Sequence, residues 1–264
     1  MKLLYCFFIS TIFLFTSRAE NNDSLFIVKQ NYINLQIGYL HRGNRDYLVS
    51  PLKYTGSSAT FLTSYSYTGT LHQHNAGISY QNTSLHSITQ NIKNELGGNL
   101  FYNYHHYINS PFSKTNFFSG ISFDNVGIIR TSTYFISPEN SSSIGETVTF
   151  EFVSSLCFAE KFEYLIDNKQ TLSLSLTLPF LSYIIRPEYN VWVNADSETD
   201  LLKTGKFQTL KTYQAFSILA KYQTTISEFI GINVEYFLSV SNFTHPQTTT
   251  TTSTKLSTTL IILF

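Results

Sequence analysis

Apolar and polar residues alternate along most of Thr147–Ile185, and this alternation restricts the fold more than any other feature of the sequence. In each of two runs, with Ser154 as an exception, every second residue is large and apolar: Val148, Phe150, Phe152, Leu156 and Phe158, then Leu172, Leu174, Leu176, Leu178 and Phe180. The residues between them are mostly small or polar. A period of two is that of a β-strand. One apolar face and one polar face over such lengths predict a wall between lipid and a polar interior.

The short segment 167–169, Asp-Asn-Lys, separates the two runs and predicts their register. A loop made of these three residues places Phe158 opposite Leu178. A loop one residue shorter would move every side chain of one strand to the wrong face. Glu160 falls on the apolar face, so we expect it near a membrane boundary, where a charge costs less than at mid-depth.

Composition also favours a membrane-spanning sheet. Charged residues make up 13% of the chain, about half the usual quarter, and aromatic residues make up 16%. No later segment offers the run of about eighteen apolar residues that a transmembrane helix needs. Lys and Arg do not cluster, so nucleic acid is not an expected partner. Among sheets, only a closed barrel satisfies every backbone polar group in lipid.

The first nineteen residues have the pattern of a secretory signal. Lys2 precedes the apolar stretch Leu3–Phe15, and Ser17 and Ala19 provide small residues before a cleavage site. The alternative is an anchor helix, for which the apolar stretch is short. We therefore expect a signal peptide at 1–19, a polar lead-in at 20–30 and an outer-membrane barrel at 31–264.

Cleavage would leave Cys157 as the one cysteine of the mature chain, so no internal disulfide is expected. Its place in the alternation predicts a small buried side chain that points into the barrel. The alternative is a reactive nucleophile. Loss of Lys2 and Arg18 from a chain of 17 basic and 17 acidic residues would leave a slight excess of acidic residues.

The same alternation elsewhere predicts about ten strands, or eight or twelve if one hairpin is merged or split. They cover 32–41, 60–70, 75–83, 98–108, 117–129, the two runs within 147–185, 211–223, 229–240 and a last strand ending at Phe264. The polar segments between them are assigned to loops, including 42–57, 84–95, 131–146, 186–207 and the threonine run 248–252. Long connections follow the odd-numbered strands, as in barrels with long extracellular loops and short periplasmic turns.

The last strand carries a row of apolar residues at every second position, with Thr258 interrupting it. The row is Leu256, Leu260, Ile262 and the terminal Phe264. With the signal and the alternating strands, this makes the chain resemble small bacterial outer-membrane β-barrel proteins, in a style like those of the Bacteroidota. The resemblance implies an antiparallel transmembrane barrel, monomeric and surrounded by outer-membrane lipid. It also implies that the barrel-insertion machinery reads the last strand as a sorting signal. A shared fold does not specify a function.

The predicted inward faces carry polar and charged side chains. They are Asn34, Gln36, Asp124, Glu151, Lys161, Asn233 and Glu235. In a barrel of about ten strands the lumen is narrow enough for side chains to fill. Buried charges there must pair or be hydrated. The sequence favours a polar network that plugs the barrel, and the alternative is a small hydrophilic pore.

No catalytic, cofactor-binding or metal-binding residue is predicted. His72 and His74 would share a strand face at metal-ligand spacing, but no Cys, Asp or Glu nearby completes a site. His74 with Ser79, and His105 with Asp124, are the pairs from which a hydrolase site could be built. Neither stretch matches the motifs of outer-membrane phospholipases, lipid A-modifying enzymes or barrel proteases.

The sequence therefore predicts an integral outer-membrane, porin-like barrel with a structural, loop-mediated binding or narrow small-solute transport role. One alternative is a barrel enzyme that acts on lipid or envelope substrates. Another is a secreted soluble β-sandwich, in which 172–180 and 230–240 would face a common core. Aromatic residues in the predicted loops would either bind a ligand or belong to the aromatic girdle of the membrane interface. These residues are Tyr47, Tyr54, Tyr134, Phe135, Tyr189 and Trp192.

Overall fold

The computed structural model describes residues 30–47, 50–88, 91–108, 114–135, 144–186, 205–244 and 248–264. In this part of the chain, no helix is long and apolar enough to cross a membrane. The described strands are β1 (Gln30–Asp46), β2 (Ser50–Thr68), β3 (His72–His86), β4 (Ile92–Ile108), β5 (Thr115–Phe135), β6 (Ile144–Leu165), β7 (Gln170–Ile185), β8 (Lys206–Thr209), β9 (Tyr213–Thr225), β10 (Ile230–Phe243) and β11 (Thr249–Leu263). The predicted signal peptide and nearly all of the lead-in lie outside the described residues.

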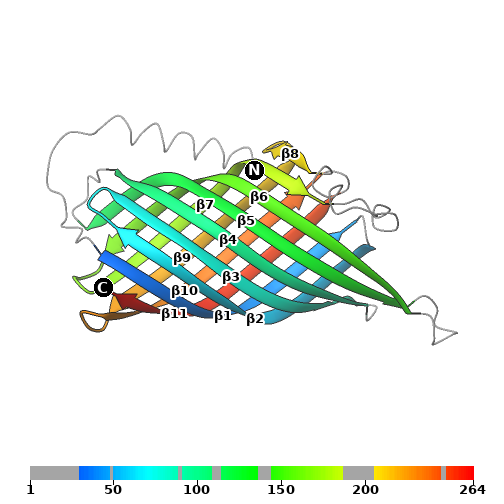
Figure 1. Cartoon of the computed structure of the whole chain (residues 1–264), viewed down its shortest axis with the longest axis horizontal. Helices are drawn as coiled ribbons and strands as arrows, with labels where there is room; N and C mark the ends of the chain where they lie inside the picture. The colour runs from blue at the N-terminus through cyan, green and yellow to red at the C-terminus, as the bar shows by residue number, and fades with distance from the viewer. Residues whose placement is uncertain are drawn as a thin grey trace.

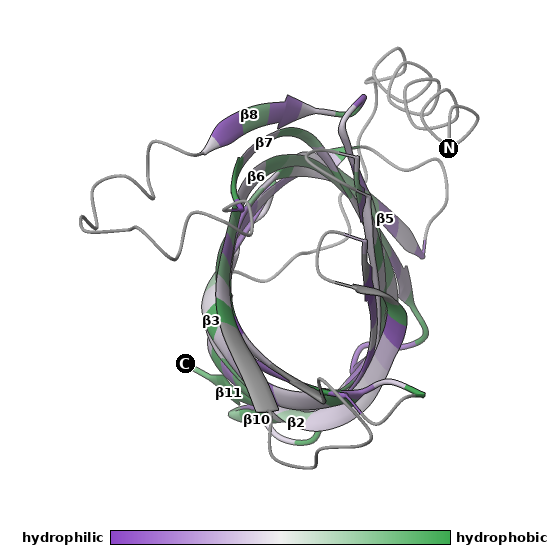
Figure 2. Cartoon of the chain, turned by 90° about the vertical axis from the view of Figure 1, so that its right-hand side faces the viewer, coloured by the Kyte–Doolittle hydropathy of each residue, from purple (hydrophilic) through white to green (hydrophobic). Residues whose placement is uncertain are grey.

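Ten antiparallel strands close into a barrel, as predicted (Figure 1). All strands but the short β8 form the ring, in which each strand pairs with the next one along the chain, β7 pairs with β9, and β1 pairs with β11 to close it. Figure 2 looks along the barrel and shows this ring. Tyr32 lies opposite Leu263, so β1 begins at the end of the barrel where β11 finishes. We call this the near end, and the end that holds the β1–β2 connection the far end.

The predicted register of the central hairpin is confirmed. In β6 and β7, Phe158 lies opposite Leu178. A bulge that the sequence analysis did not foresee follows, because Cys157 pairs with Pro179 while Leu156 pairs with Leu181. Proline lacks the N–H of a regular ladder and is found at such bulges. The extra residue reverses the alternation in the far half of β7.

The apolar rows face away from the barrel axis. Along β1, Leu35 and Ile37 are 46% and 57% exposed, whereas Asn34 and Gln36 between them are 7% and 6% exposed. The predicted inward and outward faces of β1 are therefore correct. The soluble β-sandwich is wrong, because Leu172 and other members of the rows that should meet in its core lie on the outer surface.

Several predicted loops are strands at the far end of the barrel. The segment 42–57 is mostly strand, since β1 continues to Asp46 and β2 begins at Ser50. Parts of 84–95 and 131–146, and most of the threonine run, are also strand. The predicted long connection after the first strand is accordingly wrong. These extensions were missed because they are polar on both faces and so carry no apolar row.

The wall divides near the far end of β7. β7 pairs with β9 from Gln170 to Thr177, and beyond the bulge it pairs with β8 instead. β8 falls at the end of the predicted loop 186–207, most of which lies outside the described residues. A small apolar cluster occupies this region, formed by Val153, Ile184 and Phe243 with Tyr213 packed against them.

Candidate functional site

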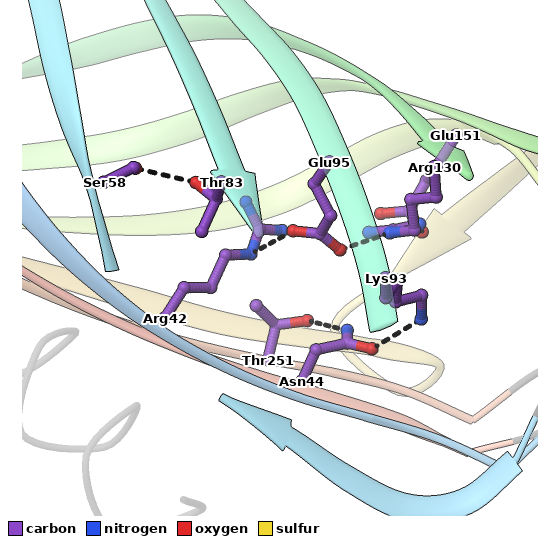
Figure 3. Close-up of polar contacts among 9 residues, drawn as sticks. All are labelled: Arg42, Asn44, Ser58, Thr83, Lys93, Glu95, Arg130, Glu151 and Thr251. Carbon is purple, nitrogen blue, oxygen red and sulfur yellow. Dashed lines mark hydrogen bonds and ion pairs between the residues drawn. The ribbon is translucent and has the colours of Figure 1, made fainter. Parts of the chain in front are cut away.

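A chain of buried ion pairs crosses the far half of the interior (Figure 3). Arg42 Nε lies 3.0 Å from Glu95 Oε2, Arg130 Nε lies 2.6 Å from Glu95 Oε1, and Arg130 Nη1 lies 2.6 Å from Glu151 Oε2. Arg186 Nε lies 3.8 Å from the same Glu151 oxygen. We call Arg42, Glu95, Arg130, Glu151 and Arg186 the charge ladder. Its charges alternate in sign, so each carboxylate lies between two guanidinium groups.

Most links of the charge ladder join neighbouring strands, since Glu95 lies directly opposite Arg130 in the β4–β5 pairing and Glu151 is on the adjacent β6, but one link does not. Arg42 is on β1 and Glu95 is on β4, with β2 and β3 between them in the sheet. Their contact must therefore pass across the lumen rather than along the wall. Because the interacting side chains are at most 8% exposed, this part of the interior admits almost no water.

A second group of polar side chains fills the space beside the ladder. Lys93 Nζ donates to Asn44 Oδ1 at 3.1 Å, and Asn44 Nδ2 donates to Thr251 Oγ1 at 3.0 Å (Figure 3). Lys93 Nζ also lies 5.3 Å from the centre of the Tyr54 ring, a cation–π contact. Lys93 and Asn44 are each 1% exposed, so this group closes the same level of the barrel.

Closer to the near end, polar groups connect β1, β10 and β11. Gln36 Nε2 donates to Glu235 Oε2 at 2.5 Å and to Thr259 Oγ1 at 3.1 Å. Lys255 Nζ donates to Gln36 Oε1 at 2.8 Å. The side chain of Asn34 donates to the hydroxyl groups of two serines on β2. Both polar ends of the Gln36 amide are therefore satisfied.

The seven residues that the sequence placed in the lumen do not form one network. Glu151 belongs to the charge ladder, and Gln36 contacts Glu235. Lys161 Nζ lies 2.6 Å from Glu163 Oε1 and donates to Gln73. Asp124 accepts from the Ser122 hydroxyl at 3.3 Å, Asn34 is bonded to β2, and Asn233 is 1% exposed. The structure thus distributes them over several groups inside the barrel.

Sequence reasoning missed most of the charge ladder. Arg42, Glu95 and Arg130 lay in predicted loops or beyond a predicted strand end. The alternation of inward and outward positions could have indicated these residues. Arg130, for example, continues the inward row of Ser122 and Asp124 on β5. Each such residue becomes meaningful only with its partner on another strand, which one strand alone does not reveal.

Cys157 is free, buried and on the inward face of β6, as predicted. Its Sγ lies 3.8 Å from an Asp124 carboxylate oxygen. The reactive-nucleophile alternative gains no support from this position, because a side chain only 3% exposed is closed to substrate.

The two pairs from which a hydrolase site could have been built are not formed. His74 faces outward, where its Nδ1 lies 2.8 Å from Tyr102 Oη, whereas the alternation turns Ser79 inward. His105 lies opposite Gly120, and Asp124 lies opposite Phe101, so the two side chains are four positions apart along the sheet. A different pair is present on the outer face, where His41 Nδ1 lies 3.0 Å from Ser57 Oγ.

The structure places only some of the predicted loop aromatics in loops, whereas it places the whole predicted sorting row of the last strand on one face. Tyr54 is not in a loop but on β2, and it is 2% exposed. Tyr134 and Phe135 belong to β5, Tyr47 is exposed in the first connection, and the two predicted aromatics of the long seventh loop, Tyr189 and Trp192, lie outside the described residues. On the last strand and its end, the predicted row shares the outer face and is 38–67% exposed: Leu256, Leu260, Ile262 and Phe264.

Solved structures that this chain is similar to include bacterial outer-membrane proteins. The chain is similar to the outer-membrane protease OmpT from Escherichia coli, with 8% identity over 92% of this chain and 100% of that chain and a TM-score of 0.57. It is also similar to the translocator domain of the autotransporter NalP from Neisseria meningitidis, with 7% identity over 89% and 90% and a TM-score of 0.44. No family model and no curated protein matches the sequence. At these identities the likeness concerns the fold alone, which is that of an outer-membrane β-barrel.

Proposed function

We propose that this protein is an integral barrel of a bacterial outer membrane that acts as a rigid, non-conducting scaffold. The outward apolar rows would contact lipid, and the interior polar groups would hold the wall in shape. The far end, with the polar strand extensions, would face the cell exterior. The protein's role would then be structural, with the exposed far end available for binding.

The observation that carries this proposal is the burial of the charge ladder inside the barrel, where its contact between Arg42 and Glu95 crosses the lumen. An ion pair in a water-filled pore would keep much of its hydration, whereas Glu95 is fully buried and Arg130 is 3% exposed. Removing charges from water is costly unless each one is paired with good geometry. At the centre of the ladder, the two 2.6 Å contacts of Arg130 with Glu95 and Glu151 meet that condition, and this supports a plugged barrel over a narrow transport route.

Planar-bilayer recording tests the plugged state. We expect the folded wild-type chain to insert without stable single-channel conductance, because side chains fill its narrow lumen. The variant Glu95→Ala/Arg130→Ala, which shortens two central members of the ladder, should produce measurable openings. Stable conductance by the wild type would contradict the scaffold and favour the small-solute pore.

A second candidate function is a hydrolase that acts on lipid, and it rests on His41 and Ser57. These side chains are within hydrogen-bonding distance on the outer face, as a Ser–His nucleophile requires. Such a site also needs a group that orients the histidine. Among the described residues, no carboxylate bonds to His41, so this candidate is less well supported than the scaffold.

Covalent labelling separates the two candidates. We expect no modification of Ser57 by a serine-directed fluorophosphonate probe, because nothing fixes the orientation of its histidine partner. Ser84→Ala, an outward serine on the next strand, serves as the matched control for Ser57→Ala. Labelling that Ser57→Ala and His41→Ala abolish, and Ser84→Ala preserves, would establish the hydrolase.

Several further properties are part of the same proposal. They are export by a signal at 1–19, recognition of the last strand by the barrel-insertion machinery, and a monomeric state. A Bacteroidota-like origin is suggested by the style of the sequence. The outward row on β11 is consistent with the role of the last strand, since those side chains are accessible along the surface.

A further inference from the structure

Three polar ring systems converge on the outer surface at the near end of the barrel. His72, at the start of β3, lies opposite His106 of β4 in the ladder. The two Nδ1 atoms are 3.2 Å apart, and Tyr104 Oη lies 2.8 Å from His72 Nδ1. The rings of His72 and Tyr104 are stacked, with centroids 5.6 Å apart, which limits the orientation of the His72 ring.

The separation of the two nitrogens matches that of metal ligands. Zinc–nitrogen bonds of about 2.0–2.1 Å at a tetrahedral angle place two ligand nitrogens about 3.3–3.4 Å apart. Without a metal, the lone pair of one Nδ1 must accept a hydrogen bond from the Nδ1–H of the other ring. Tyr104 Oη contacts the same nitrogen of His72, so two neighbours compete for a single bonding position.

We propose that His72 and His106 bind a divalent transition-metal ion through their Nδ1 atoms. Imidazole nitrogen suits Zn²⁺, Cu²⁺ and Ni²⁺. The phenol of Tyr104 lies beside the ion, and the remaining positions take water. Since no group of three or more His, Cys, Asp or Glu in the described ranges could hold a metal, the site has two strong protein ligands and binds its ion exchangeably.

His72 and His74 share a strand face, and the sequence predicted no metal there. These two residues are two positions apart on the same strand, and their Nδ1 atoms have different hydrogen-bonding partners. His74 Nδ1 lies 2.8 Å from Tyr102 Oη. The partner of His72 comes from the neighbouring strand. An aromatic girdle accounts for tyrosines at a membrane interface. It does not account for two imidazole nitrogens that face each other at 3.2 Å.

Calorimetric titration of the folded, untagged chain in detergent with ZnCl₂ tests the site. We expect one equivalent of Zn²⁺ to bind, and His72→Ala and His106→Ala should each weaken binding at least tenfold. His86→Ala is the matched control, because His86 is an exposed histidine at the opposite end of β3. Retention of the folded band in unheated gels verifies that each variant is a barrel.

A second readout identifies the ligands directly. With Cu²⁺ in place of Zn²⁺, electron paramagnetic resonance should show coupling to two imidazole nitrogens in the wild type and to one in His106→Ala. The proposal is overturned if the wild type binds no Zn²⁺, or if either histidine variant binds it as tightly as the His86 control.

Discussion

Replacement of Arg130 by methionine is expected to destabilise the barrel by about 3–5 kcal/mol, the cost typical of removing one partner from a buried ion pair. Arg130 bridges Glu95 and Glu151 at 2.6 Å to each. Without it, two buried carboxylates lose the cation between them. Methionine fills much of the same volume, so the loss reports on charge more than on packing. Urea unfolding of the barrel in detergent micelles would measure the change.

Lys53→Met provides the control for this experiment. Lys53 is also a long cation on a far-end strand segment, but it is exposed on the outer face of β2. Surface substitutions of this kind usually change the free energy of unfolding by less than about 0.5 kcal/mol. If Arg130→Met and Lys53→Met have equal effects, the charge ladder does not stabilise the wall.

Replacement of Leu260 by arginine is expected to cost about 2–4 kcal/mol of folding free energy in lipid, as for a charge at the middle of the bilayer. Leu260 is 42% exposed on the outer face, between Leu35 of β1 and Ile232 of β10 in the ladder. All three positions belong to outward apolar rows. The free energy of folding into vesicles of defined lipid would give the cost without the cellular insertion machinery.

Thr252→Arg is the matched substitution on the same strand and the same face. Thr252 lies opposite Gly43, toward the far end, where the outward residues of β11 are threonines. A charge near or beyond the membrane boundary costs about 0–1 kcal/mol. The difference between the two arginine variants therefore reports mainly on depth, because the introduced residue, the strand and the face are the same.

Sequence alone predicted the parts of this fold that depend on local alternation. The register of β6 and β7 followed from one short loop, because slipping it would have turned Leu178 and its row inward. The outward rows of β1, β10 and β11 followed from the same period of two. These features are encoded strand by strand, and each strand needs no information about its partners.

What the sequence did not predict depends on contacts between distant segments. The far ends of β1, β2, β4 and β5 lack an apolar row, so their polar residues were assigned to loops. They are strands because pairing continues along the wall, because Arg42 pairs with Glu95 across the lumen, and because Arg130 pairs with carboxylates of the two adjacent strands. The sequence likewise did not predict that His72 lies opposite His106, because the register between β3 and β4 places them there.

The central claim is that the apolar rows contact hydrocarbon around a closed, polar-filled interior. An arginine scan of the outward positions of β11, with the free energy of folding into lipid vesicles measured for each variant, tests it most directly. The cost should be largest near Leu260 and fall through Leu256 to nearly zero at Thr252. A flat profile, with Leu260→Arg no more costly than Thr252→Arg, would show that this row does not face lipid.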